Sequence, residues 1–199
     1  MAQIRHCCGG GISASVSLAE SPAREATLYA VRLARQMGKI ISFDINFRPP
    51  LWKDPEEAKI VVAEAMALAD IVKASEEEAQ LFGADLADEA AQIFLNRGPA
   101  LVLITYGSRG SSYYIPGSTE TVASFPVHTV DTTGAGDNFM GAFLSRFIRE
   151  AVPVRQLEPQ TLCEMLRYAN AAGAICASRF GAIAAQATEA EIQTFLDEK

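Results

Sequence analysis

The residues best suited to do chemistry form one short run, Asp131-Thr132-Thr133-Gly134-Ala135-Gly136-Asp137, followed by an amphipathic stretch from Asn138 to Arg149. A loop that opens a helix presents the free N–H groups of its first turn, which attract anions. The glycines let the backbone approach a phosphoryl group closely, and Asp137 could take a proton from an attacking hydroxyl beside it. The run therefore predicts a phosphate cradle with a general base. The alternative is a plain helix start in which Thr133 caps and Asp137 complements the dipole.

Other segments place polar residues or glycines next to apolar runs. These segments are Asp44-Ile45-Asn46-Phe47-Arg48-Pro49-Pro50-Leu51-Trp52, Val72-Lys73-Ala74-Ser75-Glu76-Glu77-Glu78, Thr105-Tyr106-Gly107-Ser108-Arg109-Gly110, Asn170-Ala171-Ala172 and Arg179-Phe180-Gly181-Ala182. In open α/β sheets, ligands bind at the carboxyl ends of the strands. The first three segments follow predicted strands and are therefore candidates for one binding edge.

Together with DTTGAGDNFMGAF, these segments resemble, in the same order, the motifs of ribokinase-like (PfkB) carbohydrate kinases, in the fructokinase and 2-keto-3-deoxygluconate kinase branch. The resemblance runs from about Ile4 to Thr188. It implies an α/β, ribokinase-like three-layer fold with a largely parallel central sheet. Such kinases carry a further N-terminal third with a glycine-rich sugar motif and a small β-sheet lid, so we expect a fold truncated at the N-terminus and without the lid. Ser75 stands where many relatives have Asn.

The resemblance also implies a role for each motif residue. Asp137 would be the catalytic base, and the amides of Gly134, Ala135 and Gly136 would form the anion hole. Glu78 would organise Mg²⁺ through water. The remaining implied residues are ATP contacts at Ser75, Thr105, Gly107, Ser108, Gly110 and Asn170, substrate or phosphate contacts at Asp44, Asn46 and Arg48, and a monovalent-cation site, for K⁺, at Asp131 and Thr133.

Each of the smaller motifs also has a purely structural interpretation. Ser75 and Glu78 have the spacing of a capping box, and the Thr105–Gly110 segment could be only a strand-to-hairpin turn. Arg48 could be a surface residue that leans over Trp52, although a guanidinium just past a strand end can also bind a phosphate or an acidic sugar. Asp131 and Thr133 could form an ordinary Asx or ST turn.

Composition and charge narrow the class of partner. The 199 residues are 49% hydrophobic and 21% charged, as in ordinary globular proteins, and the net charge is −7. A negative chain without clustered Lys and Arg argues against nucleic acid and anionic membranes. No secretory signal or membrane span is visible, because Arg5 and His6 interrupt the N-terminus. The expected partners are a small sugar and ATP, and the expected location is the cytoplasm.

The cysteines and histidines suggest no further chemistry. Cys163 and Cys176 have no partner at a metal-like spacing, so we expect them to pack as small apolar groups. The adjacent Cys7 and Cys8 could be redox-active, but no cation cluster lies nearby in sequence to lower a thiol pKa. His6 and His128 are isolated and receive no role.

The pattern of apolar and capping residues predicts alternating helices and strands. We expect helices from Ser21-Pro22 to Gly38 with Leu28, Val31 and Leu33 buried, from Asp54 to Ala69, over 87–96, over 159–178 and over 190–196. We expect strands over 39–44, 70–73 and 100–105, and a hairpin of strands 112–115 and 120–124. Another helix follows the cradle.

These features favour a single domain, 1–199, that serves as the nucleotide-binding and catalytic part of an ATP-dependent kinase for a small keto-sugar or sugar acid. A ribose or nucleoside kinase is the alternative within the class, and a non-catalytic nucleotide-binding remnant or subunit is the alternative outside it. A dinucleotide-binding Rossmann protein is disfavoured because no G-x-G-x-x-G follows the first strand. With the sheet edge uncovered, we expect self-association, and nucleotide binding without efficient sugar phosphorylation by this chain alone.

Overall fold

The computed structural model describes residues 10–13 and 17–199. Contacts among these residues cluster into two compact units. The first unit holds the described residues through Ile104 together with Tyr114–Ser118, and the second holds Thr105–Tyr113 together with Thr119–Lys199. The strand and loop expected around Ile4–Gly9, which include Cys7, Cys8 and His6, lie outside the described residues. The single domain expected from the sequence stays a prediction.

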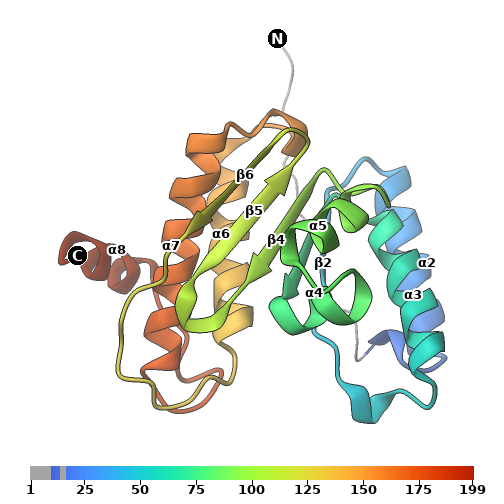
Figure 1. Cartoon of the computed structure of the whole chain (residues 1–199), viewed down its shortest axis with the longest axis horizontal. Helices are drawn as coiled ribbons and strands as arrows, with labels where there is room; N and C mark the ends of the chain where they lie inside the picture. Colours follow the sequence, from blue (N-terminus) through green and yellow to red (C-terminus); the bar gives the residue numbers. More distant parts are fainter. Residues whose placement is uncertain (1–9, 14–16) are drawn as a thin grey trace. The chain divides into compact units, whose positions relative to one another are not determined.

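The first unit alternates strands and helices, as predicted. Its elements are β1 Gly10–Ser13, α2 Ala23–Gln36, β2 Ile41–Asp44, α3 Pro55–Leu68, β3 Ile71–Ser75, α4 Glu76–Phe82, α5 Ala87–Leu95 and β4 Leu101–Thr105, with a 3₁₀ turn at Pro49–Leu51. The strands lie in the order β1-β2-β3-β4, and β2 pairs in parallel with both β1 and β3. Parallel neighbours need crossover connections, which the helices supply; α2 and α3 lie side by side (Figure 1). All of β2 is buried, as expected for a strand covered on both faces.

Local sequence predicts the start of α3 correctly, but the N-cap and the buried face predicted for α2 need correction. The Asp54 side chain accepts a hydrogen bond from Glu56 N at 2.9 Å, and Pro55 occupies the first turn, so α3 begins as predicted. Ser21 does not cap α2, because its hydroxyl donates instead to Glu25. Leu33, predicted to be buried, is 43% exposed, so the buried face of α2 is narrower than its apolar residues indicate.

The second unit consists of a hairpin and helices. Its elements are a 3₁₀ turn at Gly107–Arg109, strands β5 Ser111–Ile115 and β6 Ser118–Val122, helix α6 Ala135–Glu150, a 3₁₀ turn at Val154–Gln156, and helices α7 Pro159–Ala177 and α8 Glu189–Asp197. The hairpin turns at Pro116-Gly117, where Gly117 has a φ of 81°. Strand β6 begins two residues earlier than predicted and β5 one residue earlier, because the turn is shorter than the polar segment suggests. The residues of the hairpin are divided between the two units.

Helices α6 and α7 make the most extensive helix contact in the molecule, and α8 packs on α7 (Figure 1). At Gly173 the helices come close, since a Cβ on this residue would lie 3.4 Å from the Ala135 carbonyl oxygen. The start of α6, which carries the predicted chemistry, is therefore held against a long and largely buried helix. No helix among the described residues is long and apolar enough to cross a bilayer.

Candidate active site

The cradle, residues 131–137, turns into helix α6 at Gly134. Gly134 is the N-cap of α6 and has a left-handed conformation, φ 78° and ψ 0°. A Cβ there would lie 3.0 Å from the Ala182 Cβ and 3.1 Å from its Cα. Both the backbone conformation and the close approach therefore require glycine. Thr133 does not cap the helix, so that part of the plain-helix alternative is wrong.

The first turn of α6 leaves backbone N–H groups free. Ala135 N donates to Thr132 O at 3.1 Å, so this predicted anion-hole amide already has a partner. Within the part of the chain that the structure describes, the amides of Gly136 and Asp137 have none. A helix N-terminus with unpaired N–H groups attracts negative charge. An anion can therefore bind at the amides of Gly136 and Asp137. Gly136 is one of the predicted anion-hole residues, and Asp137 is an addition to them.

Asp131 stabilises the loop before the helix. Its Oδ1 accepts hydrogen bonds from Thr133 N at 2.9 Å and Thr133 Oγ1 at 2.6 Å, and its Oδ2 accepts one from Gly181 N at 3.1 Å. These bonds, above all the one from the Thr133 hydroxyl, lower the pKa of Asp131. The local turn considered as an alternative for Asp131 and Thr133 is thus present. The monovalent-cation role of these residues stays a prediction.

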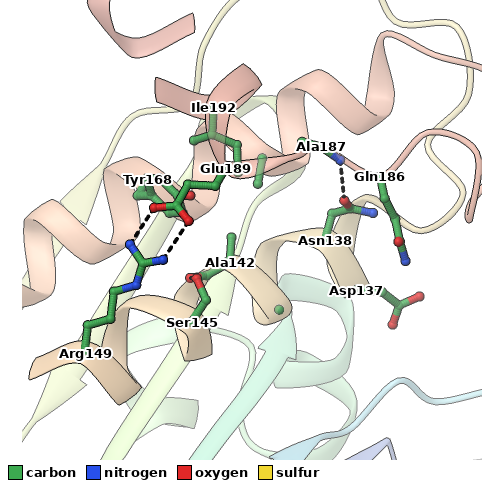
Figure 2. A pocket seen from close by; sticks show the side chains of 12 residues that line it. Asp137, Asn138, Ala142, Ser145, Arg149, Tyr168, Gln186, Ala187, Glu189 and Ile192 are labelled. Carbon is green, nitrogen blue, oxygen red and sulfur yellow. Dashed lines mark hydrogen bonds and ion pairs between the residues drawn. The ribbon is translucent and has the colours of Figure 1, made fainter. Parts of the chain in front are cut away.

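Asp137 lies at the exposed start of α6 and its carboxylate is available. Figure 2 shows this carboxylate pointing away from Asn138, and it forms no hydrogen bond or ion pair with any residue among 10–13 and 17–199. An exposed, unpaired carboxylate beside free helix amides has the position required of a group that takes a proton from a hydroxyl. Its catalytic role stays a prediction.

The predicted nucleotide loop, residues 105–110, forms a tight turn closed by a hydrogen bond of 2.8 Å from Tyr106 N to Gly110 O. Gly107 has a φ of 60° and Gly110 a φ of 113°. A Cβ at Gly110 would lie 2.1 Å from Val122 O, so the loop packs directly against the end of β6. Both glycines are therefore needed for the backbone path.

A cavity of about 590 Å³ in the second unit brings the cradle and the nucleotide loop together. This volume is within the range of small-molecule sites. The predicted site residues that line it are Thr105, Gly107, Ser108, Gly110, Ala135, Gly136 and Asn170. Ser124, Phe125 and Thr129, which the sequence analysis did not single out, also line it. They come from a segment without a motif, so no signal in the sequence marks them.

Asn170 contributes to this cavity from α7, but its polar atoms are already bonded. Its Oδ1 accepts a hydrogen bond from Ser111 Oγ at 2.9 Å, and its Nδ2 donates to Val122 O at 2.9 Å and to Ala123 O at 3.4 Å. The residue is 5% exposed. Its side chain fastens the end of the hairpin to α7, and any contact with a nucleotide would be additional.

A second group of predicted residues lies at the strand ends of the first unit. Asp44, at the end of β2, is 6% exposed and forms an ion pair with Lys73, whose Nζ lies 3.1 Å and 3.2 Å from its carboxylate oxygens. Asn46 has a φ of 40°, a left-handed conformation that Asn tolerates better than most residues. The chain thus turns sharply just after the strand, as binding segments often do.

Ser75 and Glu78 form the capping box predicted as their structural alternative. Glu78 N donates to Ser75 Oγ, and Glu78 Oε2 accepts a hydrogen bond from Ser75 N at 2.7 Å. The other carboxylate oxygen, Oε1, accepts one from Phe47 N at 2.6 Å. Glu78 therefore connects the segment after β2 to the start of α4.

Arg48 is exposed and donates only a long hydrogen bond, 3.3 Å, to the carbonyl oxygen of Phe47. The guanidinium recorded over the Trp52 ring is that of Arg24, 5.7 Å from the ring centroid, and the suggestion that Arg48 leans over Trp52 stays a prediction. The roles predicted for Asp44, Asn46, Arg48, Ser75 and Glu78 in binding stay predictions.

No group of three or more His, Cys, Asp or Glu side chains that could hold a metal ion occurs in the described parts of the chain. Mg²⁺ in phosphoryl-transfer enzymes is usually held by one or two carboxylates together with phosphate oxygens and water. The residues present therefore fit an ion carried by a nucleotide better than a metal cage built by the protein.

Comparison with known proteins decides the family. The model described as "pfkB family carbohydrate kinase" matches residues 2–189. The chain belongs to this family. The chain is 38% identical to the probable fructokinase-2 of Arabidopsis thaliana over 92% of its own length and 55% of that protein, and 39% identical to fructokinase-1 of Zea mays over 92% of its own length and 57% of that protein.

Solved structures of this kinase family share the fold. A fructokinase from Vibrio cholerae O395, in its fructose, ADP and calcium ion bound form, matches 94% of this chain and 61% of its own, with 33% identity and a TM-score of 0.84. The aminoimidazole riboside kinase of Salmonella enterica, complexed with aminoimidazole riboside and an ATP analogue, matches with 31% identity and a TM-score of 0.83, over 94% and 61% of the two chains. The ribokinase-like α/β fold predicted from the motifs is thereby confirmed.

This PfkB-family chain spans about half the length of the fructokinases from Arabidopsis and Zea mays. It covers 87% of another relative, the putative fructokinase-8 of Arabidopsis thaliana, at 38% identity. The residues matched in all of these proteins include the cradle and the nucleotide loop, since the alignments cover at least nine-tenths of the chain.

Proposed function

We propose that this chain is the nucleotide-binding and catalytic portion of an ATP-dependent sugar kinase that acts on fructose or a similar small keto-sugar or sugar acid. One observation carries the proposal. A single cavity in the second unit is lined by the nucleotide loop and by Gly136, whose amide is free, and the available carboxylate of the next residue, Asp137, lines a separate groove of about 380 Å³. The cavity supports binding of a phosphorylated nucleotide, and the carboxylate supports transfer to a hydroxyl.

The reaction balances with these groups. The acceptor hydroxyl loses its proton to the Asp137 carboxylate as its oxygen bonds to the γ-phosphorus, and the bond from that phosphorus to the bridging oxygen breaks, releasing ADP. The free amides at the start of α6 would hydrogen-bond the charge on the transferring phosphoryl group, the kind of electrostatic stabilisation that dominates phosphoryl transfer. Mg²⁺ bound to the nucleotide would neutralise phosphate charge.

The proposed acceptor rests on the resemblance of the whole segment to known kinases. It does not rest on a sugar-binding site among the described residues. The fructokinases named above support fructose, and the segment from Asp44 to Trp52 supports the same branch. The aminoimidazole riboside kinase keeps a riboside acceptor as the second candidate within the class.

The test separates binding from transfer. Calorimetric titration of the chain with Mg²⁺ and a non-hydrolysable ATP analogue should show saturable binding. A coupled ADP-release assay on the natural protein that contains these residues, with fructose, 2-keto-3-deoxygluconate, ribose and a nucleoside, should then show the highest kcat/KM for fructose. Absence of nucleotide binding would contradict the proposal. Binding without transfer to any of these acceptors would identify the chain as a nucleotide-binding portion that does not transfer phosphoryl groups by itself.

A further inference from the structure

The segment between α7 and α8, residues 181–187, lies against the cradle and is here called the strap. The Oδ2 of Asp131 accepts a hydrogen bond from Gly181 N at 3.1 Å, and the Oδ1 of Asn138 accepts one from Ala187 N at 3.2 Å. Between these two bonds, Ala182 lies so close to Gly134 that a Cβ on the glycine would come within 3.0 Å of the Ala182 Cβ. The strap is therefore fixed to the cradle at both ends.

The side chain of Asn138 bonds to three different segments: the cradle, helix α7 and the strap. Figure 2 shows its amide directed toward Ala187, away from the Asp137 carboxylate. Its Nδ2 donates to Gly134 O at 3.0 Å and to Cys176 Sγ at 3.3 Å. One side chain thus joins the cradle, helix α7 and the strap.

The partners fix which amide atom faces which group. The backbone N–H of Ala187 needs an acceptor and the carbonyl of Gly134 needs a donor, so only one orientation of the Asn138 amide satisfies both. The Cys176 thiol, which is fully buried, then donates to Thr133 O over 3.6 Å. Position 138 therefore requires a side chain that both donates and accepts hydrogen bonds. An amide does both, whereas a carboxylate lacks the donor.

The Gly134 carbonyl is the point at which Asn138 acts on the cradle. Gly134 has no side-chain cap, and its carbonyl oxygen accepts both Asn138 N at 2.8 Å and Asn138 Nδ2. The direction of this carbonyl fixes the orientation of the peptide between Gly134 and Ala135. That orientation determines where the next backbone amides, those of Gly136 and Asp137, point.

We propose that Asn138 is a positioning residue for phosphoryl transfer: by clamping Gly134 O, Cys176 and Ala187 together, it holds the cradle amides and the Asp137 carboxylate in the geometry that the reaction needs. This inference rests on the proposed kinase function. Asn138 itself touches neither nucleotide nor acceptor in the reaction derived above. Its effect is expected on the transition state, where the amides meet developing charge, rather than on nucleotide binding.

The decisive variant is Asn138→Asp, which keeps the size of the side chain and the acceptor for Ala187 N but places an oxygen against the Gly134 carbonyl. The matched control is Gln156→Glu, because Gln156 is exposed in the turn between α6 and α7 and uses its side chain in no hydrogen bond with a described residue. Both variants make the same amide-to-acid change within the second unit.

Steady-state kinetics on the natural protein that contains these residues should show kcat reduced about 10- to 100-fold in Asn138→Asp, since a displacement of about 1 Å at a catalytic centre can cost about 10²-fold. KM for the nucleotide should stay within about twofold, because uniform binding is little changed. Gln156→Glu should match the wild type in both parameters. Unchanged kcat in Asn138→Asp would overturn the proposal.

Hydrogen exchange provides a readout that does not depend on activity. In Asn138→Asp, the hydrogen-bonded amides of Ala135 and of residue 138 should exchange at least about tenfold faster, while exchange in the first unit stays at the wild-type rate. If exchange is faster in Asn138→Asp but the wild type transfers no phosphoryl group, the positioning role of Asn138 is supported and only the kinase proposal is rejected. Unchanged exchange in the cradle, or equal acceleration throughout the chain, would overturn the positioning role. If Asn138→Asp fails to fold, Asn138→Ala, which removes the side-chain bonds to Gly134, Cys176 and Ala187 without adding a charge, takes its place in both measurements.

Discussion

The hydroxyl of Ser111 and the side-chain oxygen of Asn170 are joined by a hydrogen bond of 2.9 Å, and neither residue is more than 5% exposed. The amide nitrogen of Asn170 donates to the carbonyls of Val122 and Ala123. A single side chain on α7 thus satisfies polar groups on both strands of the hairpin. Family resemblance assigns Asn170 to the nucleotide. The same side chain also holds together the wall of the cavity that Asn170 lines.

Replacing Asn170 by Ala should destabilise the protein by about 2–4 kcal/mol, because the Ser111 hydroxyl and the Val122 carbonyl would remain buried without partners. Urea unfolding measures the change. Asn96→Ala, at an exposed position, is the control and should cost no more than about 0.5 kcal/mol. Full stability combined with loss of nucleotide binding would instead make Asn170 a ligand contact without a structural role.

Asp137→Asn should lower turnover by about 10²- to 10⁴-fold, the usual effect of losing a general base, in the natural protein that contains these residues. Nucleotide affinity should change little, because the amides at the start of α6 remain in place. Glu150→Gln makes the same chemical change at the exposed far end of the same helix and should leave turnover unaltered. Near-normal turnover in Asp137→Asn would remove this residue from the reaction.

Gly110→Ala should cost more than about 3 kcal/mol, since the Cβ would lie 2.1 Å from Val122 O and the φ of 113° is strained for any other residue. Gly117→Ala is a matched control, because Gly117 also has a positive φ, 81°, but a Cβ there meets nothing within 4 Å. Its cost should be only about 1 kcal/mol. Thermal unfolding compares the two, and equal costs would show that the packing of the nucleotide loop on β6 is not required.

Lys73→Met should cost about 3–5 kcal/mol, because it leaves the buried carboxylate of Asp44 without its ion-pair partner. Replacing both residues, Asp44→Leu with Lys73→Met, should recover a large part of that loss. Lys59→Met, in an exposed pair with Glu56, should change stability by no more than about 1 kcal/mol. Chemical denaturation of the wild type, these three variants and Asp44→Leu measures these differences, and a double variant whose loss equals the sum of the two single losses would show that the buried pair is not coupled.

Acid should weaken the junction between α7 and α8. Hydrogen bonds from Arg179 and from Thr188 lower the pKa of Glu191 from 4.5 to about 2. Because the folded-state pKa lies below the ordinary value, the stabilisation is complete above pH 4.5 and is lost as the pH falls toward about 2. Glu191→Gln should therefore flatten the decrease in unfolding temperature over this range, whereas Glu198→Gln, at an exposed position, should not. Parallel pH curves for wild type and Glu191→Gln would refute this assignment.

The sequence predicted most elements of the fold because their signals are local. Asp54 with Pro55 marked the start of α3, and the apolar run after Pro99 marked β4. Helix α4 was anticipated only as the Ser75–Glu78 capping box, since its seven residues are too short for a clear apolar period.

The candidate site was only partly predictable. The glycines of the cradle and the nucleotide loop are visible in sequence because backbone conformation demands them, and the family motifs supply their roles. Most bonds of Asn170 and Asn138 are not visible, because they depend on partners more than thirty residues away in the chain; the bond from Asn138 to Gly134, four residues away, is the exception. The partner of Asp44 and the guanidinium over Trp52 also come from distant parts of the chain, so they could not be named from the sequence.

The close contact of α6 and α7 at Gly173 has a consequence for the choice of nucleobase. Much of the wall of the large cavity is glycine and alanine, including Gly173, Ala174 and Ala177, and the amide of Asn170 is already bonded. A purine ring in this part of the cavity would meet backbone and methyl groups rather than side-chain donors and acceptors. Such a wall distinguishes nucleobases only by the thickness and shape of their rings, and adenine and guanine share both. We therefore expect this chain to discriminate only weakly between ATP and GTP, and any strong preference to require a polar group from outside this wall.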